Sequence, residues 1–265
     1  MANWIKKGKM FTSVSGVVTG GFKKAYQIGA FKEPPKDILP KYIQTFCRKT
    51  CQSFNLEVVQ LEPVPQTHGL WASNHISWLD IPVVGSVSPC FFLSKAEIAN
   101  WPVVGKLAKA AGTLFIERGS GDVGSVGNQI ADFMQDGSSV VFFPEATTTS
   151  GHKVKRVYGK LLQAVMQTGL PIQPIVICYV GADGNISDDA AYFGNITMKQ
   201  SLDKVLKAGK ITAYVLPLEA IYPEDKTQKE LTEILQERMQ AGLVRLQKQV
   251  LKTQPADAVW DEYDV

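Results

Sequence analysis

Apolar and polar positions alternate along most of the chain in a way that predicts strands and helices in turn. Short apolar runs bounded by turn residues predict seven strands, near 56–61, 70–73, 90–93, 113–116, 139–143, 172–179 and 211–216. Apolar positions spaced three and four apart predict helices over 38–53, from about 77, around 105–111, and over 123–136, 158–168 and 225–251. Such alternation is typical of a parallel sheet covered by helices. We therefore predict an α/β fold, a single domain with a largely parallel central sheet flanked by helices.

The first 33 residues follow a different pattern. Six lysines precede the first acidic residue, Glu33, while apolar residues recur three or four apart, which predicts amphipathic helices with a break near Gly20–Gly21. A basic amphipathic helix can lie on an anionic membrane surface, where each basic residue contributes about 1 kcal/mol. We predict this membrane contact; the alternative is a helix that packs on the core and turns its lysines to water.

Length and composition limit the remaining possibilities. The 265 residues suit one large α/β domain over 34–254, with its motifs at about 68–180. The helices of 1–33 precede this domain and an acidic tail at 255–265 follows it. A net charge of +3, without a basic run interleaved with aromatics, gives no sign of a nucleic-acid partner. Four cysteines without a C-x-x-C pair and only three histidines disfavour a zinc site and indicate a reducing compartment. No apolar stretch reaches the roughly 18–20 residues that would cross a bilayer.

A polar turn follows the predicted strand at 70–73 and reads Asn-His-Ile-Ser-Trp-Leu-Asp over 74–80. Positions five apart on a helix differ by about 140°, so His75 and Asp80 meet only if a helix begins between them, with Ser77 as its predicted N-cap. An imidazole held by a carboxylate is a general base. We predict that His75 takes a proton from an acceptor hydroxyl that attacks an acyl thioester. The alternative is a structural histidine beside a capping aspartate.

Two further polar turns end predicted strands. Arg118 follows an apolar strand and is suited to bidentate binding of phosphate or carboxylate, although a surface salt bridge is the alternative. Glu145 opens a hydroxyl-rich turn over 144–151, where backbone N–H groups can face an anion and Glu145 can hold acceptor hydroxyls. Here the alternative is a simple polar loop. The Pro-edged strand at 170–176 is interpreted as a pocket wall.

Together and in this order, these stretches resemble the lysophospholipid acyltransferase family, whose type member is 1-acyl-glycerol-3-phosphate acyltransferase. The four family motifs match in turn Asn74, His75 and Asp80; Gly112, Phe115, Ile116 and Arg118; Phe143, Pro144, Glu145 and Thr147; and Pro171, Ile172 and Pro174. The resemblance spans roughly residues 68–180.

The resemblance implies a catalytic pair of His75 and Asp80, in agreement with the interpretation of the turn. It also implies an acyl-CoA or acyl carrier protein donor, a lysolipid acceptor, no metal or prosthetic group, and attachment to the cytoplasmic face of the inner membrane. Substrate binding is implied for the remaining motif positions and their neighbours: Asn74, Arg118, Glu145, Ala146, Thr147 and Thr148.

Two positions depart from the family pattern. Ala146 replaces the glycine of the third motif, and an alanine is strained there if the site requires a positive φ. Thr148 stands where enzymes for lysophosphatidic acid usually have arginine, so the run 147–151 is more similar to the lyso-ornithine-lipid branch. A missing positive charge weakens the case for a dianionic phosphate acceptor.

Two other functions compete with this interpretation. The stretch Gly119–Gly124 fits G-x-G-x-x-G between a predicted strand and a predicted helix, as in a NAD-binding oxidoreductase, but this leaves His75 and Asp80 unexplained. A non-catalytic membrane-binding protein is the other alternative, and the intact pair at 75 and 80 argues against it.

Overall fold

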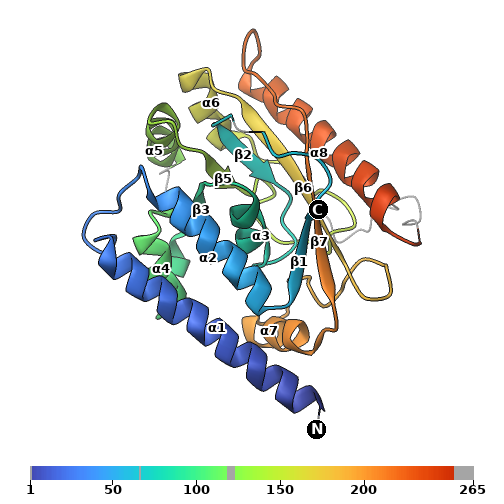
Figure 1. Ribbon diagram of the computed structural model, residues 1–265. Coiled ribbons are helices and arrows are strands. Elements are labelled where there is room, and N and C mark those ends of the chain that lie inside the picture. The colour runs from blue at the N-terminus through green and yellow to red at the C-terminus, as the bar shows by residue number, and fades with distance from the viewer. Residues whose placement is uncertain (1, 66, 118–122, 254–265) are drawn as a thin grey trace.

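A seven-stranded sheet forms the centre of the protein, in a computed structural model that describes residues 2–65, 67–117 and 123–253. Its strands stand in the order β1-β7-β6-β2-β5-β3-β4 (Figure 1). Their bounds are β1 Leu56–Gln60, β2 Leu70–Ser73, β3 Phe91–Lys95, β4 Leu114–Ile116, β5 Val140–Phe142, β6 Ile172–Val180 and β7 Ile211–Pro217. All seven strands lie within about two residues of their predicted positions.

Five neighbouring strands of this sheet, β6, β2, β5, β3 and β4, run parallel. β7 pairs antiparallel with β6 and parallel with β1, so β1 and β7 run opposite to the other five. The predicted largely parallel sheet is therefore confirmed. Because parallel strands end at the same edge, the carboxyl ends of these five strands bring their following turns together.

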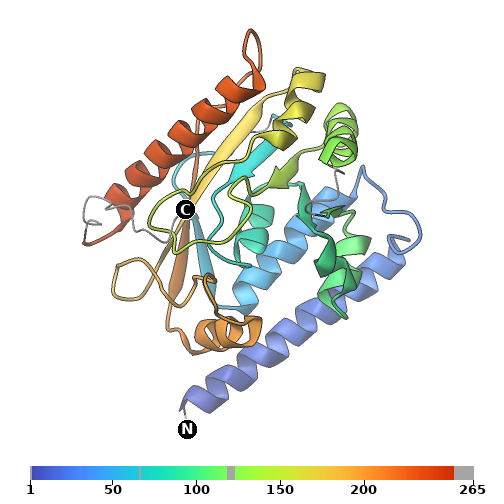
Figure 2. The same ribbon diagram turned by 180° about the vertical axis from the view of Figure 1, so that it is seen from behind.

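Helices cover both faces of the sheet. The α-helices are α1 Ala2–Gln27, α2 Leu39–Ser53, α3 Asp80–Val87, α4 Val104–Ala110, α5 Val123–Gln135, α6 Gln163–Thr168, α7 Met198–Lys207 and α8 Gln228–Val250. Two 3₁₀ helices, η1 Ala96–Asn100 and η2 Lys160–Leu162, complete the set within the described residues. α2 packs on α3 on one side of the sheet, and α8 packs on β6 on the other (Figures 1 and 2). The molecule is an α/β single domain, as predicted.

The first helix differs from its prediction, because α1 continues through Gly20–Gly21 without a break. A Cβ atom at Gly21 would lie 2.7 Å from the Phe46 ring of α2, so the glycine allows the two helices to approach closely. Met10 is buried and Val14 packs against the core, whereas Phe11 and Tyr26 are largely exposed. None of the described helices is long and apolar enough to cross a membrane.

Three further helical segments test the predicted pattern of apolar positions. The predicted helix at 158–168 is a 3₁₀ turn followed by the short α6. The predictions contain no helix at α7, although Thr197 and Gln200 form a capping box at its start. A second capping box, formed by Thr227 and Glu230, begins α8, whose predicted apolar face is confirmed because Leu235 and Met239 are fully buried.

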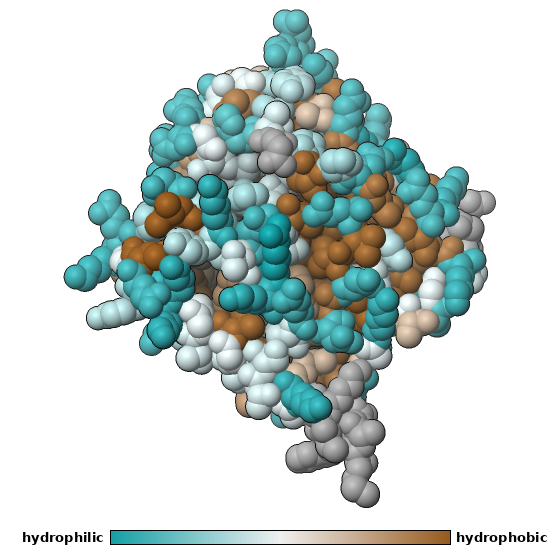
Figure 3. Space-filling model, in the orientation of Figure 1, coloured by the Kyte–Doolittle hydropathy of each residue, from teal (hydrophilic) through white to brown (hydrophobic). Residues whose placement is uncertain are grey.

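Apolar residues are unevenly distributed over the face seen in Figure 1. In Figure 3 they gather right of centre, over β1 and β7, and polar side chains surround them. The predicted acidic tail at 255–265 lies outside the described residues.

Candidate active site

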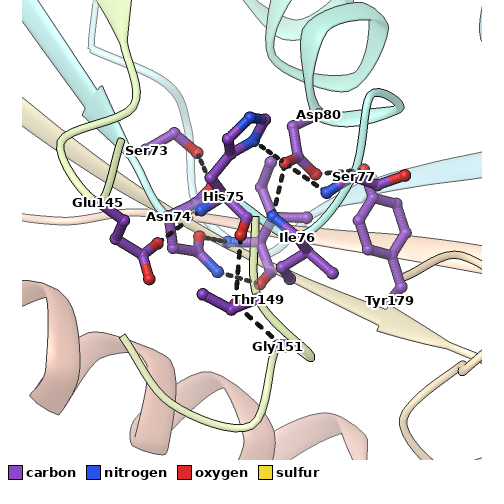
Figure 4. Close-up of polar contacts among 11 residues, drawn as sticks. Ser73, Asn74, His75, Ile76, Ser77, Asp80, Glu145, Thr149, Gly151 and Tyr179 are labelled. Carbon is purple, nitrogen blue, oxygen red and sulfur yellow. Dashed lines mark hydrogen bonds and ion pairs between the residues drawn. The ribbon is translucent and has the colours of Figure 1, made fainter. Parts of the chain in front are cut away.

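The turn that follows β2 brings His75 and Asp80 together. His75 Nδ1 lies 2.7 Å from Asp80 Oδ2, so the predicted contact across a bend is confirmed (Figure 4). The contact forms because His75 lies in the turn and α3 begins at Asp80 itself. Both side chains lie at the carboxyl edge of the parallel strands, where α/β folds place their ligand sites.

Asp80 is fully buried, and hydrogen bonds surround its carboxylate. Oδ2 also accepts the backbone N–H groups of Ile76 at 2.7 Å and Ser77 at 2.9 Å, and Oδ1 accepts the Tyr179 hydroxyl at 2.8 Å. The prediction that Ser77 caps the helix is wrong: Leu79 is the N-cap, without a side-chain hydrogen bond, and Ser77 contributes its N–H to Asp80 instead. Four donors therefore hold this carboxylate in one position.

The imidazole of His75 has a fixed orientation and an accessible edge. It stacks on the Phe143 ring, with 4.1 Å between ring centroids, and its side chain remains 21% exposed. Because a carboxylate only accepts, Nδ1 carries the proton in the neutral ring and Nε2 is left as the basic nitrogen. This arrangement suits general-base catalysis at Nε2.

Asn74 ties the same turn to the neighbouring strand. Its buried amide accepts the Ile177 N–H at 2.8 Å and donates to the Ile177 carbonyl at 3.0 Å. The predicted contact of Asn74 with substrate stays a prediction, since the interactions present connect β2 to β6.

Glu145 is buried in the turn after β5 and bridges two backbone segments. Oε1 accepts the His75 N–H at 2.7 Å, and Oε2 accepts the Lys155 N–H at 2.6 Å. Burial raises the pKa of Glu145 to about 8, although these two N–H groups oppose the shift. Both carboxyl oxygens thus accept backbone N–H groups beside His75 and Asp80, and acceptor binding by Glu145 stays a prediction.

The hydroxyl-rich turn also contacts His75 directly. Thr149 donates its N–H to the His75 carbonyl at 2.8 Å, so both backbone polar groups of His75 bond to this loop. Ala146 adopts a φ of 57°, which confirms that the position occupied by glycine in the family motif requires the left-handed region. Thr147 is exposed and Thr148 is partly exposed, so both hydroxyls can reach a ligand.

The sequence patterns did not predict two sets of supporting residues. One is Tyr179, whose position at the end of an apolar strand gave no sign that its hydroxyl reaches Asp80. The other is a row of α8 glutamines that bond backbone groups of the loop over 151–157: Gln236 to Val157, Gln240 to Val154, and Gln247 to Gly151 and His152. Positions 236, 240 and 247 recur at helical spacing, a signal that could have indicated a polar face in contact with a loop.

Arg118 and the first four positions of Gly119–Gly124 lie outside the described residues. In the part of the chain that the structure describes, no group of three or more His, Cys, Asp or Glu side chains is placed to hold a metal ion.

Comparison with known proteins decides between the proposed functions. The Acyltransferase family model matches residues 55–178. The chain is 32% identical over 213 residues to the lyso-ornithine lipid O-acyltransferase of Pseudomonas aeruginosa, a match that covers 79% of this chain and 82% of that protein. The chain belongs to this acyltransferase family. It is an O-acyltransferase, so the NAD-binding and non-catalytic alternatives are wrong.

Two more comparisons agree with this membership. The acyltransferase is 32% identical over 175 residues to the 1-acyl-sn-glycerol-3-phosphate acyltransferase of Neisseria meningitidis, covering 64% of this chain and 68% of that protein. It shares its fold with the crystal structure of the 1-acyl-sn-glycerophosphate acyltransferase PlsC from Thermotoga maritima, with a TM-score of 0.66 at 17% identity. That match covers 92% of this chain and 96% of the other.

Proposed function

We propose that this acyltransferase moves a fatty acyl group from a thioester donor to the free hydroxyl of a lysolipid, with His75 and Asp80 as the catalytic pair. The observation that carries the proposal is the 2.7 Å contact between His75 Nδ1 and a buried Asp80, which leaves Nε2 as the basic nitrogen of a partly exposed side chain. The proposed acyl donors are acyl-CoA and acyl carrier protein, whose thioesters have the same reacting atoms.

The reaction follows from this geometry. Nε2 takes the proton of the acceptor hydroxyl as its oxygen attacks the thioester carbonyl carbon, and Asp80 stabilises the imidazolium that forms. The new C–O bond closes the ester, the C–S bond breaks, and the proton passes from Nε2 to the departing thiolate. A free thiol is therefore released for each ester formed.

Asn74 and Glu145 act on this reaction through the backbone of His75. Asn74 anchors the residue before His75 to β6, and Glu145 accepts the His75 N–H itself. We assign both residues a positioning role, whereas Thr147, Thr148 and Arg118 are the proposed contacts to the acceptor.

Lyso-ornithine lipid is the proposed acceptor, and 1-acyl-glycerol-3-phosphate is the second candidate. The uncharged Thr148 favours the first, because a dianionic phosphate is normally bound by positively charged groups. The similarity to the Pseudomonas aeruginosa enzyme, whose name specifies lyso-ornithine lipid, supports the same choice.

The proposed place of the reaction is the cytoplasmic face of the inner membrane, with residues 1–33 as the contact. α1 turns Phe11, Tyr26 and the lysines at 9 and 23 outward, which suits an anionic lipid surface.

A thiol-release assay with acyl-CoA tests the function. Purified protein is offered lyso-ornithine lipid, 1-acyl-glycerol-3-phosphate or no acceptor, and we expect acceptor-dependent thiol release that is fastest with lyso-ornithine lipid. His75→Ala should lower the rate at least about 100-fold, whereas His68→Ala, at an exposed histidine before β2, should not. Full activity in His75→Ala would refute the proposed catalytic pair.

A further inference from the structure

Four consecutive apolar residues are exposed where η1 passes into α4. Trp101 is 36%, Val103 46% and Val104 51% exposed, and Pro102 between them is also exposed. Single exposed apolar residues are common on protein surfaces. A run of three or four exposed apolar residues is unfavourable in water and is typical of a surface that binds a partner. We call residues 101–104 the apolar turn.

The charges around the apolar turn are mainly positive. Lys106 and Lys109 on α4 are exposed, and Glu97 on η1 is the acidic side chain of this segment. α1 packs beside α4, with Gly21 next to Leu107, so the basic helix α1 and the apolar turn belong to neighbouring elements (Figures 1 and 2). A tryptophan, aliphatic side chains and lysines together are typical of a segment that enters an anionic membrane interface.

The apolar turn follows the carboxyl end of β3, which lies on the same side of the sheet as the turn with His75. β3 ends at Lys95 and η1 follows at once. β3 runs parallel to β5, and β5 runs parallel to β2, which leads into His75. A lipid acceptor that leaves the membrane at the apolar turn therefore emerges on the side of the protein where its hydroxyl must react.

We propose that the apolar turn inserts into the anionic membrane surface and forms a second contact, separate from α1, through which the lysolipid acceptor enters the site. This inference rests on the proposed function, because it takes the acceptor to be a membrane lipid.

The test uses lysolipid acceptors with the same reacting hydroxyl, either embedded in vesicles or dissolved as monomers. Val103→Ser/Val104→Ser removes half-exposed methyl groups and leaves the buried side of α4 unchanged. Sedimentation with vesicles of phosphatidylglycerol and phosphatidylcholine should show about ten-fold weaker binding than wild type. Thiol release with a lysolipid embedded in these vesicles should fall by a similar factor, while release with a short-chain lysolipid dissolved as monomers should not change.

The matched control is Tyr222→Ser/Val244→Ser. Both side chains are exposed to a similar extent, but Tyr222 follows Ile221, which bridges to the amino end of β6, and Val244 lies on α8. This control should bind vesicles and use both acceptors as wild type does. Trp101→Ala provides a second variant, and circular dichroism establishes that each variant is folded.

Three results would overturn the inference. Unchanged vesicle binding in both variants of the apolar turn would show that it faces water. An equal loss with the monomeric acceptor would place the turn in the reaction itself. If wild type is a dimer that the variants dissociate, and vesicle binding is unchanged, the apolar turn is a contact between subunits. In each case an active wild-type protein leaves the proposed acyl transfer intact, whereas failure of that function appears as no acceptor-dependent thiol release from wild type.

Discussion

The candidate site is formed by two segments, the turn with His75 and Asp80 and the loop over 143–157. These two segments are held in place in different ways. In the turn, three of the four groups that bond Asp80 come from residues 75–77, within five positions of it. The loop contacts His75 through Glu145 and Thr149 and is itself fixed by glutamines of α8, which lie about 80 to 96 positions further along. The comparison teaches that contacts close in sequence bring His75 and Asp80 together, whereas contacts from distant residues hold the loop that bonds the His75 backbone.

The largest effect is expected from Asp80→Asn. The amide oxygen can replace Oδ2 and the amide nitrogen can donate to Tyr179, so the turn should stay folded while the negative charge is lost. Without that charge the imidazolium of His75 is not stabilised, and kcat should fall by about 10²–10⁴-fold. Thiol release and a thermal unfolding curve together measure this, and near-normal kcat in a folded variant would contradict a catalytic role for Asp80.

Tyr179→Phe tests the hydrogen bond that the Asp80 carboxylate receives from a distant strand. Its loss leaves Oδ1 without this donor, so the Asp80 carboxylate is held less firmly and orients the His75 imidazole less well. We expect kcat to fall about ten-fold with both KM values unchanged, since one hydrogen bond to a charged group contributes about 1.5–3 kcal/mol. A raised KM with normal kcat would instead mean that Tyr179 shapes the binding site.

Glu145→Gln tests how the loop is attached. Burial raises the pKa of Glu145 to about 8, above its ordinary value of 4.5, so the folded protein binds the proton more tightly than the unfolded chain. The contribution of this group to the free energy of unfolding is full below pH 4.5 and is lost as the pH rises through about 8. Denaturant unfolding at pH 5 and pH 8.5 should show a loss in wild type of the order of a few kcal/mol.

The same measurement on Glu145→Gln should show a smaller dependence on pH, because the amide does not ionise. Its free energy of unfolding at pH 5 should be lower than that of wild type by about 1–3 kcal/mol, because the amide nitrogen cannot accept an N–H. An identical pH dependence in the two proteins would show that Glu145 is not the titrating group.

The smallest effect is expected from Ala146→Gly. Ala146 has a φ of 57°, and glycine adopts this conformation without strain, so the free energy of unfolding should rise by up to about 1 kcal/mol. Ala108→Gly, inside α4, is the matched control and should lower it by about the same amount. Denaturant unfolding measures both, and a destabilised Ala146→Gly would mean that the alanine side chain makes contacts that outweigh its strain.

Much of this molecule could be predicted from its sequence, and the failures have physical causes. The strands were predictable because apolar runs such as 172–179 are bounded by turn residues. The predicted break at Gly20–Gly21 is wrong because the glycines serve a contact with α2, where Phe46 lies against Gly21, and the pattern of one helix does not show this contact. The predictions omit α7, although its apolar residues Leu202, Val205 and Leu206 have helical spacing.

For the site, the sequence by itself determined the contact of His75 with Asp80 and the edge of the sheet at which it lies. These features depend on residues that are close in sequence or on the common direction of parallel strands. Only the tertiary structure decided that Tyr179 bonds Asp80 from 99 positions away, that Glu145 bridges His75 to Lys155, and that α8 fixes the loop. The reason is that a buried polar group requires a partner, but which distant residue supplies it depends on how the whole chain packs.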